Sequence, residues 1–318
     1  MKNTEPASSA RNIFDAIVVG EALIDIVTSA DGTSEHPGGS PANVAYGLGR
    51  LGVSTGLLTA IGDDERGGEI EAHLRAGGVV LLPGSHSLAR TASATATLAA
   101  DGSASYEFDI DWKLPPVAPA HLPRVLHTGS IATFLAPGAG TVKSLLEQSH
   151  RSCLVTYDPN IRPALLGSHA QAQGIFEDLV PLTDVVKLSD EDALWLYPGK
   201  TLEDTARHIL RLGADLAVIT QGPEGSLLAT AAAELSVPSV KSQVADTIGA
   251  GDSYMAALIL GLLTRAGEGL GPEVLDRLGR TASMAAAITV RRPGANPPTL
   301  EELEHHLQAP EAAAHAHA

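Results

Sequence analysis

The stretch Asp246-Thr247-Ile248-Gly249-Ala250-Gly251-Asp252 runs directly into an apolar segment, Ser253–Leu263, that has the length of a buried helix. A glycine-rich turn at a helix start leaves several backbone N–H groups pointing at one spot, at the positive end of the helix dipole. Such a turn is typical of an anion site, and phosphate is its usual occupant. Asp252 could accept a proton from a hydroxyl while those N–H groups stabilise charge on a transferred group. Taken alone, the stretch also fits an ordinary turn with an acidic residue in the first turn of the helix.

Upstream of this turn, short apolar runs alternate with amphipathic stretches. The runs expected to form buried strands are Ala16–Gly20, Val125–Thr128, Leu154–Asp158, Val185–Leu188 and Leu216–Thr220. The stretches expected to form helices are Ala42–Leu51, Gly68–Ala76, Gly140–Ser149 and Thr201–Leu212. This alternation predicts an α/β fold with a mainly parallel sheet flanked by helices on both faces. Ligands of such sheets bind beyond the carboxyl ends of the strands, so the functional residues are expected there.

Two segments depart from the alternation. Residues 23–34 and 90–110 contain period-two patterns such as T-A-S-A-T-A-T-L and S-Y-E-F-D-I. We expect them to form antiparallel strands outside the main sheet, as a small β-sheet lid over a cleft. An edge hairpin without a moving role is the alternative. Residues 13–307 are predicted to form a single domain, with 1–12 and 308–318 as tails.

The composition excludes several classes of protein. The chain has 318 residues, and Lys+Arg 21 against Asp+Glu 37 gives a net charge of −16. This charge, with 3% aromatic residues, argues against a nucleic-acid partner. The single cysteine, Cys153, fits a reducing compartment. The first dozen residues are polar and no stretch approaches the ~20 apolar residues of a membrane span. We therefore expect a cytoplasmic protein with no membrane partner.

A second motif, Pro37-Gly38-Gly39-Ser40-Pro41-Ala42-Asn43, precedes the helix expected over Val44–Leu51. Paired glycines let a backbone approach a ligand closely, and the Asn43 side chain offers both a donor and an acceptor to hydroxyls. Asp25 lies just beyond the first expected strand, where a carboxylate can bind two vicinal hydroxyls of a polyol. The alternative interpretation of the motif is a loop with a helix cap.

Together these motifs resemble the PfkB/ribokinase family of sugar kinases. The segment Gly38–Ala45 is similar to the N-terminal signature of the family. The stretch Asp246–Asp252, followed by Ala256-Ala257-Leu258, is similar to its C-terminal signature, which is the more specific of the two. The resemblance covers residues 13 to 307 and implies a ribokinase-like fold.

The resemblance also implies roles for individual residues. Asp252 would be the general base, and Gly249, Ala250 and Gly251 would form the anion hole for the γ-phosphate of ATP. The implied sugar-binding residues are Asp25, Gly38, Gly39, Asn43 and Arg162. The implied nucleotide-binding residues are Thr220, Gly222, Gly225 and Lys187. Asp246, Ile248 and Gly294 lie where many members of the family bind a monovalent cation such as K⁺.

One segment departs from the family pattern. Many members carry Asn-x-x-Glu, linked to Mg²⁺ and phosphate, after the strand that corresponds to Val185–Leu188. Here Ser189 and Asp192 occupy the two places. Asp192 could orient metal-bound water, because hard oxygen ligands suit Mg²⁺. Glu191 or Asp190 could serve instead, or the run could simply be an acidic helix start.

The choice of sugar depends on Asp158-Pro159-Asn160-Ile161-Arg162-Pro163, which resembles fructokinases and 2-dehydro-3-deoxygluconate kinases. Arg162 suits a phosphate or a carboxylate, or it could be a surface residue. Gly20–Asp25 and Gly129–Thr133 look most like fructokinases, so we predict phosphorylation of D-fructose at O6. The alternatives are 2-dehydro-3-deoxygluconate, another sugar or nucleoside, and a non-catalytic sugar-binding regulatory protein. We also expect a homodimer through the small sheet, because its edges and one face would otherwise lie open.

Overall fold

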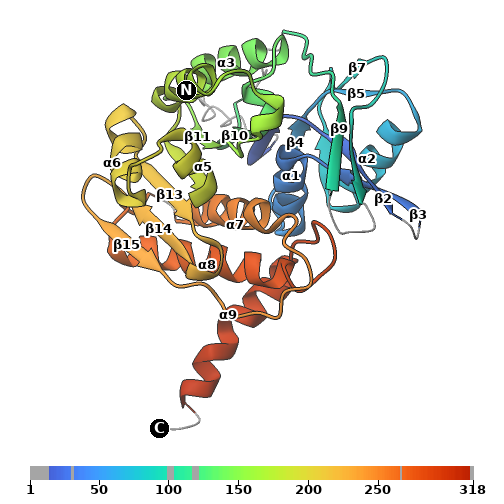
Figure 1. The fold of residues 1–318 in the computed structure, drawn as a ribbon. Helices are drawn as coiled ribbons and strands as arrows, with labels where there is room; N and C mark the ends of the chain where they lie inside the picture. Colours follow the sequence, from blue (N-terminus) through green and yellow to red (C-terminus); the bar gives the residue numbers. More distant parts are fainter. Residues whose placement is uncertain (1–13, 30–31, 99–103, 117–121, 266, 316–318) are drawn as a thin grey trace, which may run out of the picture.

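Figure 1 presents the computed structural model of the protein, which describes residues 14–29, 32–98, 104–116, 122–265 and 267–315. Within these residues the largest sheet has the order β15-β14-β13-β12-β11-β10-β1-β4-β6. Neighbouring strands from β6 to β13 in this order are parallel, and β14 and β15 are antiparallel. The bounds are β1 Ala16–Val19, β4 Thr55–Leu58, β6 Val79–Leu81, β10 Val125–Gly129, β11 Leu154–Asp158, β12 Val185–Ser189, β13 Leu216–Thr220, β14 Ser226–Ala229 and β15 Glu234–Val237.

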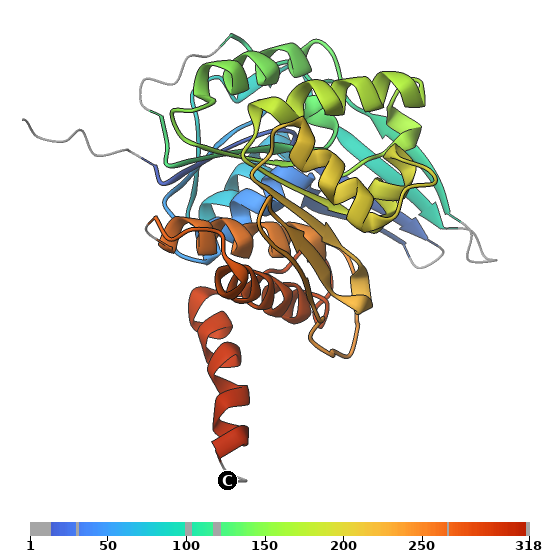
Figure 2. The same ribbon diagram turned by 90° about the vertical axis from the view of Figure 1, so that its left-hand side faces the viewer.

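Helices cover both faces of this sheet, as predicted. Alternate side chains of β1 belong to different cores: Ala16 and Val18 pack with α1, α7 and α8, whereas Ile17 and Val19 pack with α3, α4 and α6. Figure 2 shows α7 and α8, in orange and red, below the strands and the green and yellow helices above them. The bounds are α1 Ser40–Arg50, α2 Glu65–Ala76, α3 Gly138–Ser149, α4 His169–Leu179, α5 Asp190–Leu196, α6 Leu202–Leu212, α7 Ala250–Thr264, α8 Pro272–Thr289 and α9 Leu300–His315.

The helix that follows the glycine-rich turn is buried on most sides. Helix α7 contacts both α1 and α8, and its sequence is apolar all round, as a helix inside a fold must be. It begins after Gly249, whose φ of 73° is left-handed and favours glycine. Helix α1 carries Pro41 in its first turn, where the missing N–H costs no hydrogen bond. Ser40 and Asn43 at the start of α1 hydrogen-bond to Asp252 at the start of α7, so the two helices begin side by side.

A separate small sheet stands beside the main body, with the order β3-β2-β8-β9. The bounds are β2 Leu23–Ser29, β3 Gly32–Gly38, β8 Ser93–Leu98 and β9 Ala104–Asp109. The prediction of antiparallel strands was wrong for the central pair, because β2 and β8 are parallel, with Ile24 opposite Ser93. The chain between them passes through α1, β4 and α2, so it re-enters the sheet from the same end. The hairpin β2–β3 also extends beyond residue 34 to Gly38.

A short two-stranded pair, β5 Ile61–Gly62 and β7 His86–Leu88, lies beside α2. Among the described residues, no helix is long and apolar enough to cross a membrane.

Candidate active site

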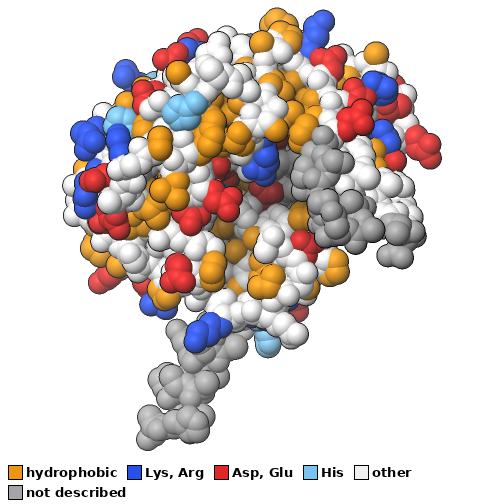
Figure 3. Space-filling view, in the orientation of Figure 1, with side chains coloured by type: hydrophobic (Ala, Val, Ile, Leu, Met, Phe, Trp, Pro, Cys, Tyr) orange, Lys and Arg blue, Asp and Glu red, His pale blue; other side chains and the backbone are white. Residues whose placement is uncertain are grey.

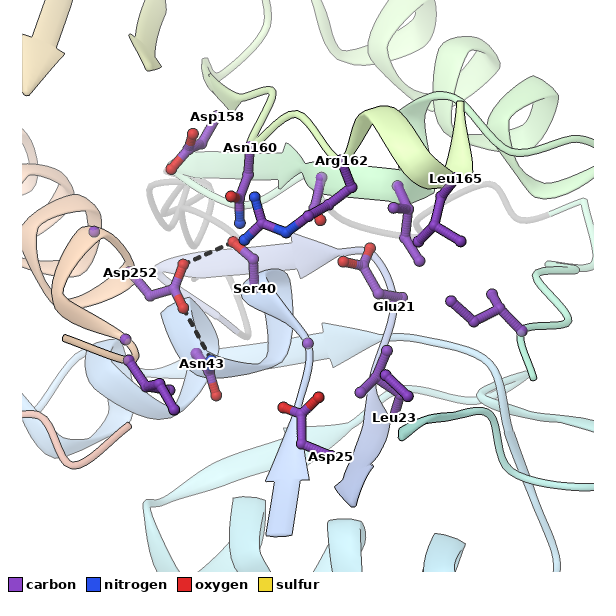
Figure 4. Close-up of a pocket in the computed structure, with 18 of the residues that line it drawn as sticks. Glu21, Leu23, Asp25, Ser40, Asn43, Asp158, Asn160, Arg162, Leu165 and Asp252 are labelled. Atoms are coloured by element: carbon purple, nitrogen blue, oxygen red, sulfur yellow. Dashed lines mark hydrogen bonds between the residues drawn. The ribbon is translucent and has the colours of Figure 1, made fainter. Parts of the chain in front are cut away.

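A cavity of about 430 Å³ lies at the carboxyl ends of β1, β10 and β11, under the small sheet. Figure 3 shows acidic and basic side chains together at the hollowed centre of this face, and Figure 4 shows the cavity at close range. This is the edge of a parallel sheet at which ligands bind. The lining residues are Glu21, Leu23, Asp25, Gly39, Ser40, Asn43, Ala94, Phe108, Ile110, Ser130, Ile131, Asp158, Asn160, Arg162, Leu165, Lys187, Thr247, Ile248, Gly249, Gly251 and Asp252.

Asp252 lies in the first turn of α7 and is 9% exposed. Ser40 Oγ donates to its Oδ1 at 2.7 Å, and Asn43 Nδ2 donates to its Oδ2 at 2.9 Å. Burial raises the pKa of Asp252 above its usual value, and these two hydrogen bonds oppose the rise. Each oxygen of this carboxylate thus accepts a hydrogen bond from the start of α1, which fixes its position. A fixed carboxylate whose pKa is raised suits the role of a general base.

The two glycines before α1 allow the residues predicted to bind the sugar to come together. Gly38 lies against Asp25, because a Cβ at Gly38 would stand 2.0 Å from Asp25 Oδ2. Gly39 has a φ of 99°, and a Cβ there would stand 2.7 Å from the carbonyl oxygen of Glu21. The contact at Gly39 is with backbone and excludes a side chain, whereas a side chain at Gly38 would force the Asp25 carboxylate to move. Of the predicted sugar-binding residues, Asp25, Gly39, Asn43 and Arg162 line the cavity, and Gly38 packs against Asp25 without lining it.

The side chain of Asp246 connects the predicted anion turn to the loop that contains Gly294. Asp246 Oδ1 accepts from Ile248 N at 3.0 Å, and its Oδ2 accepts from Gly294 N at 2.8 Å. A Cβ at Gly249 would stand 2.7 Å from Ala295 Cβ, so the turn packs closely on the same loop. Residues 247–249 and Gly251 line the cavity, and Ala250 begins α7 behind them.

Two acidic residues on the cavity wall have shifted pKa values. Burial raises the pKa of Glu21 to about 8, although its Oε2 accepts from Ala132 N at 3.1 Å. Burial also raises the pKa of Asp25 to about 6, a rise that Arg162 and His36 oppose. The guanidinium of Arg162 extends into the cavity between Asn160 and Glu21, and its Nη1 donates to the Ile161 carbonyl at 3.0 Å.

Three of the predicted nucleotide-binding residues lie farther along the sheet and do not line this cavity. Thr220 ends β13, opposite Ser189 of β12. Gly222 and Gly225 form the turn into β14, with φ values of 51° and 104°. A Cβ at Gly225 would stand 2.1 Å from the Val237 carbonyl oxygen, so glycine is required there by packing alone.

The side chain of Asp192 is buried, and both of its oxygens accept hydrogen bonds from backbone N–H groups. Its Oδ1 accepts from Ile161 N at 2.9 Å, and its Oδ2 accepts from Ser189 N at 3.1 Å. Ser189 Oγ in turn accepts from Asp192 N at 3.0 Å, which completes a capping box at the start of α5. Among the described residues, no group of three or more His, Cys, Asp or Glu side chains could hold a metal ion.

Sequence reasoning did not assign four polar residues of the cavity: Glu21, Ser40, Asp158 and Asn160. All four lie inside motifs that were recognised, next to residues that were assigned. Asn160 is a non-glycine residue with a φ of 39°, a conformation that Asn tolerates better than most residues. The signal that could have found them is their place at the carboxyl end of a strand or at the start of a helix.

The cavity combines the predicted anion turn, a buried carboxylate beside it and a polar wall, an arrangement that suits phosphoryl transfer to a polyol. The model of the pfkB family carbohydrate kinases matches residues 14–303. The chain is 30% identical over 314 residues to an uncharacterized sugar kinase of Pyrococcus horikoshii, with 92% of this chain and 96% of that protein covered. The structure of that kinase in complex with ATP has a TM-score of 0.72, at 29% identity, and covers 90% of this chain and 96% of that one.

Two fructokinases are also similar to the chain. That of Rhizobium leguminosarum bv. trifolii is 33% identical over 255 residues, which cover 76% of this chain and 78% of the relative. A double mutant of the Vibrio cholerae enzyme, solved with fructose, ADP and a potassium ion bound, shares the fold with a TM-score of 0.73. It is 23% identical, with 92% of this chain and 96% of that one covered. The chain belongs to the pfkB family of carbohydrate kinases.

Proposed function

We propose that this chain transfers the γ-phosphoryl group of ATP to O6 of D-fructose, giving fructose 6-phosphate and ADP. The observation that carries the proposal is the position of Asp252, which Ser40 and Asn43 hold at 2.7 and 2.9 Å beside the Gly249–Gly251 turn. Fructose O6 attacks the γ-phosphorus, its proton passes to Asp252, and the bond from the γ-phosphorus to the bridging oxygen of ADP breaks. The backbone N–H groups of the turn stabilise the transferring group. A sugar-binding regulatory protein without turnover would not need this base.

The sugar is expected against Asp25, Gly39 and Asn43, which occupy one wall of the cavity. The name of the rhizobial relative, a fructokinase, favours fructose. The nucleotide is expected to extend from the anion turn toward Thr220, Gly222 and Gly225 at the end of β13. The low number of aromatic residues in the cavity wall disfavours a nucleoside as the acceptor.

The metal ions are part of the proposal. Mg²⁺, when bound with the nucleotide, neutralises charge on the phosphates. The residues that could hold Mg²⁺ are Asp158 and Asp192. Asp158 Oδ1 is buried at the cavity without a hydrogen-bond partner, and each Asp192 oxygen accepts one backbone N–H. So few free carboxylate oxygens fit a Mg²⁺ ion that keeps most of its water ligands. Asp158 and Asp192 would hold that water shell. The loops that Asp246 joins at Ile248 and Gly294 would hold K⁺, as the potassium-bound relative suggests.

A second sugar is favoured by one side chain. Arg162 extends its guanidinium into the cavity, where it could pair with the carboxylate of 2-dehydro-3-deoxygluconate. A panel of sugars with ATP and Mg²⁺, followed by ADP release, decides between the two. We expect a higher kcat/KM for fructose, and a higher value for the acid would overturn our choice. Arg162→Ala should change the KM for fructose little, whereas for the acid it should raise KM at least tenfold.

Two further features complete the proposal. The compartment is the cytoplasm, which suits the one free cysteine of the sequence, Cys153. The small sheet acts as a lid over the cavity and as the contact of a two-fold homodimer. The exposed length of β3 at the edge of that sheet supports the second point.

A further inference from the structure

The side chain of Glu21 reaches from the end of β1 to a short turn that follows β10. This turn is the 3₁₀ helix η1, Ser130–Thr133, and β10 is a parallel neighbour of β1. Glu21 Oε2 accepts from Ala132 N at 3.1 Å, and the side chain of Ser130 also hydrogen-bonds to the carboxyl group. Glu21 is 4% exposed, so both bonds are shielded from water. The carboxyl group of Glu21 therefore fastens η1 to the neighbouring strand.

The same turn is held from its other side. Trp112 Nε1 donates to the Ala132 carbonyl at 3.0 Å, and Trp112 is buried a few residues beyond the end of β9. Thr133 Oγ1 donates to the Ser130 carbonyl at 2.8 Å. Ala132 thus has a side-chain partner on both its backbone N–H and its carbonyl group. The position of η1 is set by side chains from two distant parts of the chain.

The backbone of η1 is strained at its first residue. Ser130 has a φ of 54°, in the left-handed region that a non-glycine residue rarely adopts. Such a conformation persists only where the surroundings impose it, and it is found mostly at functional sites. In this turn Ser130 and Ile131 both line the cavity. The strain points to a role for η1 at the cavity, because it lowers the stability of the fold.

Glu21 also contacts the wall that is predicted to bind the sugar. A Cβ at Gly39 would stand 2.7 Å from the backbone carbonyl oxygen of Glu21, so the two backbones are packed together. The carboxyl group of Glu21 is directed into the cavity, as Figure 4 shows. Glu21 therefore joins two walls of the cavity, that of Gly39 through its backbone and that of Ser130 and Ile131 through its side chain.

Glu21 can fasten η1 without adding a charge to the cavity. Burial, with a smaller contribution from the charge of Asp252, raises its pKa to about 8, so the group is a neutral acid at pH 7. A neutral carboxyl group has a donor and an acceptor, as the amide of glutamine has. Glu21→Gln is therefore the conservative variant at this position, and Glu21→Ala is the variant that removes the contact.

We infer that Glu21 is a positioning residue, which holds η1 so that Ser130 and Ile131 form a wall of the acceptor site. The inference rests on the proposed kinase function and adds to it a residue that acts through η1. Glu21 takes no proton from the sugar, whose proton goes to Asp252. A wall touches the sugar equally in the ground state and in the transition state, so its loss should raise KM for the sugar and leave kcat nearly unchanged.

Steady-state kinetics at pH 7 test the inference, with whichever sugar the wild type phosphorylates. Glu21→Ala should raise KM for the sugar at least tenfold, while KM for ATP and kcat change less than about threefold. Glu21→Gln should stay within about twofold of the wild type in all three values. A variant that is merely less stable would instead lose kcat and keep both KM values. That result, or a Glu21→Gln as impaired as Glu21→Ala, would overturn the inference.

The matched control is Asp184→Ala. Asp184 Oδ2 accepts from Val155 N at 2.6 Å, so this carboxylate also holds a backbone N–H, but at the amino ends of β11 and β12, away from the cavity. Asp184→Ala should lower the stability and leave KM for the sugar unchanged. An equal rise of that KM in Asp184→Ala and Glu21→Ala would show a general effect of destabilisation and would overturn the inference.

Trp112→Phe approaches the same turn without altering Glu21. It removes the hydrogen bond to the Ala132 carbonyl and keeps an aromatic ring in the core, so it tests the role of η1 even if Glu21→Ala does not fold. KM for the sugar should rise in this variant as well. In the double variant with Glu21→Ala, the rise should be smaller than the product of the two single effects, because both residues hold one turn. An unchanged KM in Trp112→Phe would contradict the role of η1.

Amide hydrogen exchange measures the contact without any sugar. In Glu21→Ala the segment 130–135 should exchange at least tenfold faster than in the wild type, because Ala132 N has lost its acceptor. In Glu21→Gln it should exchange at the wild-type rate. Unchanged exchange in Glu21→Ala would refute the positioning role. A wild type that phosphorylates no sugar would refute the proposed function, and the exchange rates would still decide whether Glu21 holds η1.

Discussion

Asp252 receives one hydrogen bond on each carboxylate oxygen, both from residues at the start of α1. Asp252→Asn keeps the shape but cannot accept the proton of the sugar hydroxyl. We expect kcat to fall ~10²–10⁴-fold with KM for sugar and ATP within a few-fold of the wild type. Steady-state kinetics check this, with Asp276→Asn on the exposed side of α8 as the control. A variant that kept most of its kcat would show that Asp252 is not the base.

Glu21 should make the stability of the protein depend on pH. Its folded-state pKa is raised from 4.5 to about 8, so the folded chain holds a proton that the unfolded chain releases. The stability from this group is complete below pH 4.5 and is lost as pH rises toward 8, with a slope of up to about 1.4 kcal/mol per pH unit. Glu21→Gln should remove that slope.

Urea denaturation of the wild type and Glu21→Gln between pH 6.5 and 8 isolates this effect. Asp25 and Asp158 have pKa values of about 6 and contribute mainly below this range. Buried His127, with a pKa of about 3, acts in the opposite direction and only up to about pH 6.5. Parallel stability curves for the two proteins would contradict the raised pKa of Glu21.

The residues that sequence reasoning predicted and those it missed differ in what determines their position. Asp252 and Asn43 lie in motifs whose local geometry fixes their direction, at the start of a helix. Lys187 and Asp158 are 29 residues apart and meet only because β11 and β12 are neighbours in the sheet. No local pattern indicates such a pair: Lys187 was predicted from the family resemblance, and Asp158 was left unassigned although it ends a predicted strand.

Helix α5 depends on Asp192, which caps its first turn and also fastens Ile161 of the preceding loop. Asp192→Ala removes acceptors from Ile161 N and Ser189 N, so it should lower the free energy of unfolding by about 1–3 kcal/mol. Ser189→Ala removes only the cap and should cost about 1 kcal/mol. Chemical denaturation measures both. Equal, negligible losses would show that Asp192 is not a structural anchor and would favour a role toward Mg²⁺.

The elements were predictable where their patterns were long and unpredictable where pairing was non-local. The five strands predicted from apolar runs all occur within one residue of the expected bounds. Strands β4 and β6 are short, and their Thr55-Gly56 and Val79-Val80 segments carry no periodicity that distinguishes them from loops. The parallel pairing of β2 with β8 follows from the path of the whole intervening chain, which alternation cannot reveal.

At the scale of the molecule, the small sheet has one covered face and one open face. Ile26 is buried in the core that also holds Ile70 of α2, and Arg66 of α2 pairs with Glu35 of β3 at 2.7 Å. The opposite face carries Asp25 and Ala94, which line the cavity, and continues toward Val27 and Ala96, which are opposite each other in the register. A sheet with one unpacked face and exposed edges is a surface on which a second copy can dock.

We therefore expect a two-fold dimer in which the open faces of two small sheets meet. Light scattering at micromolar concentration should give twice the chain mass of 32.7 kDa. Ala96→Arg places a charge on the open face, away from Asp25, so it should yield monomers that retain ATP binding. Ala232→Arg, on an exposed turn before β15, is the control and should remain dimeric. A 32.7 kDa species in the wild type would refute the dimer. A dimer that Ala96→Arg does not disturb would place the contact elsewhere.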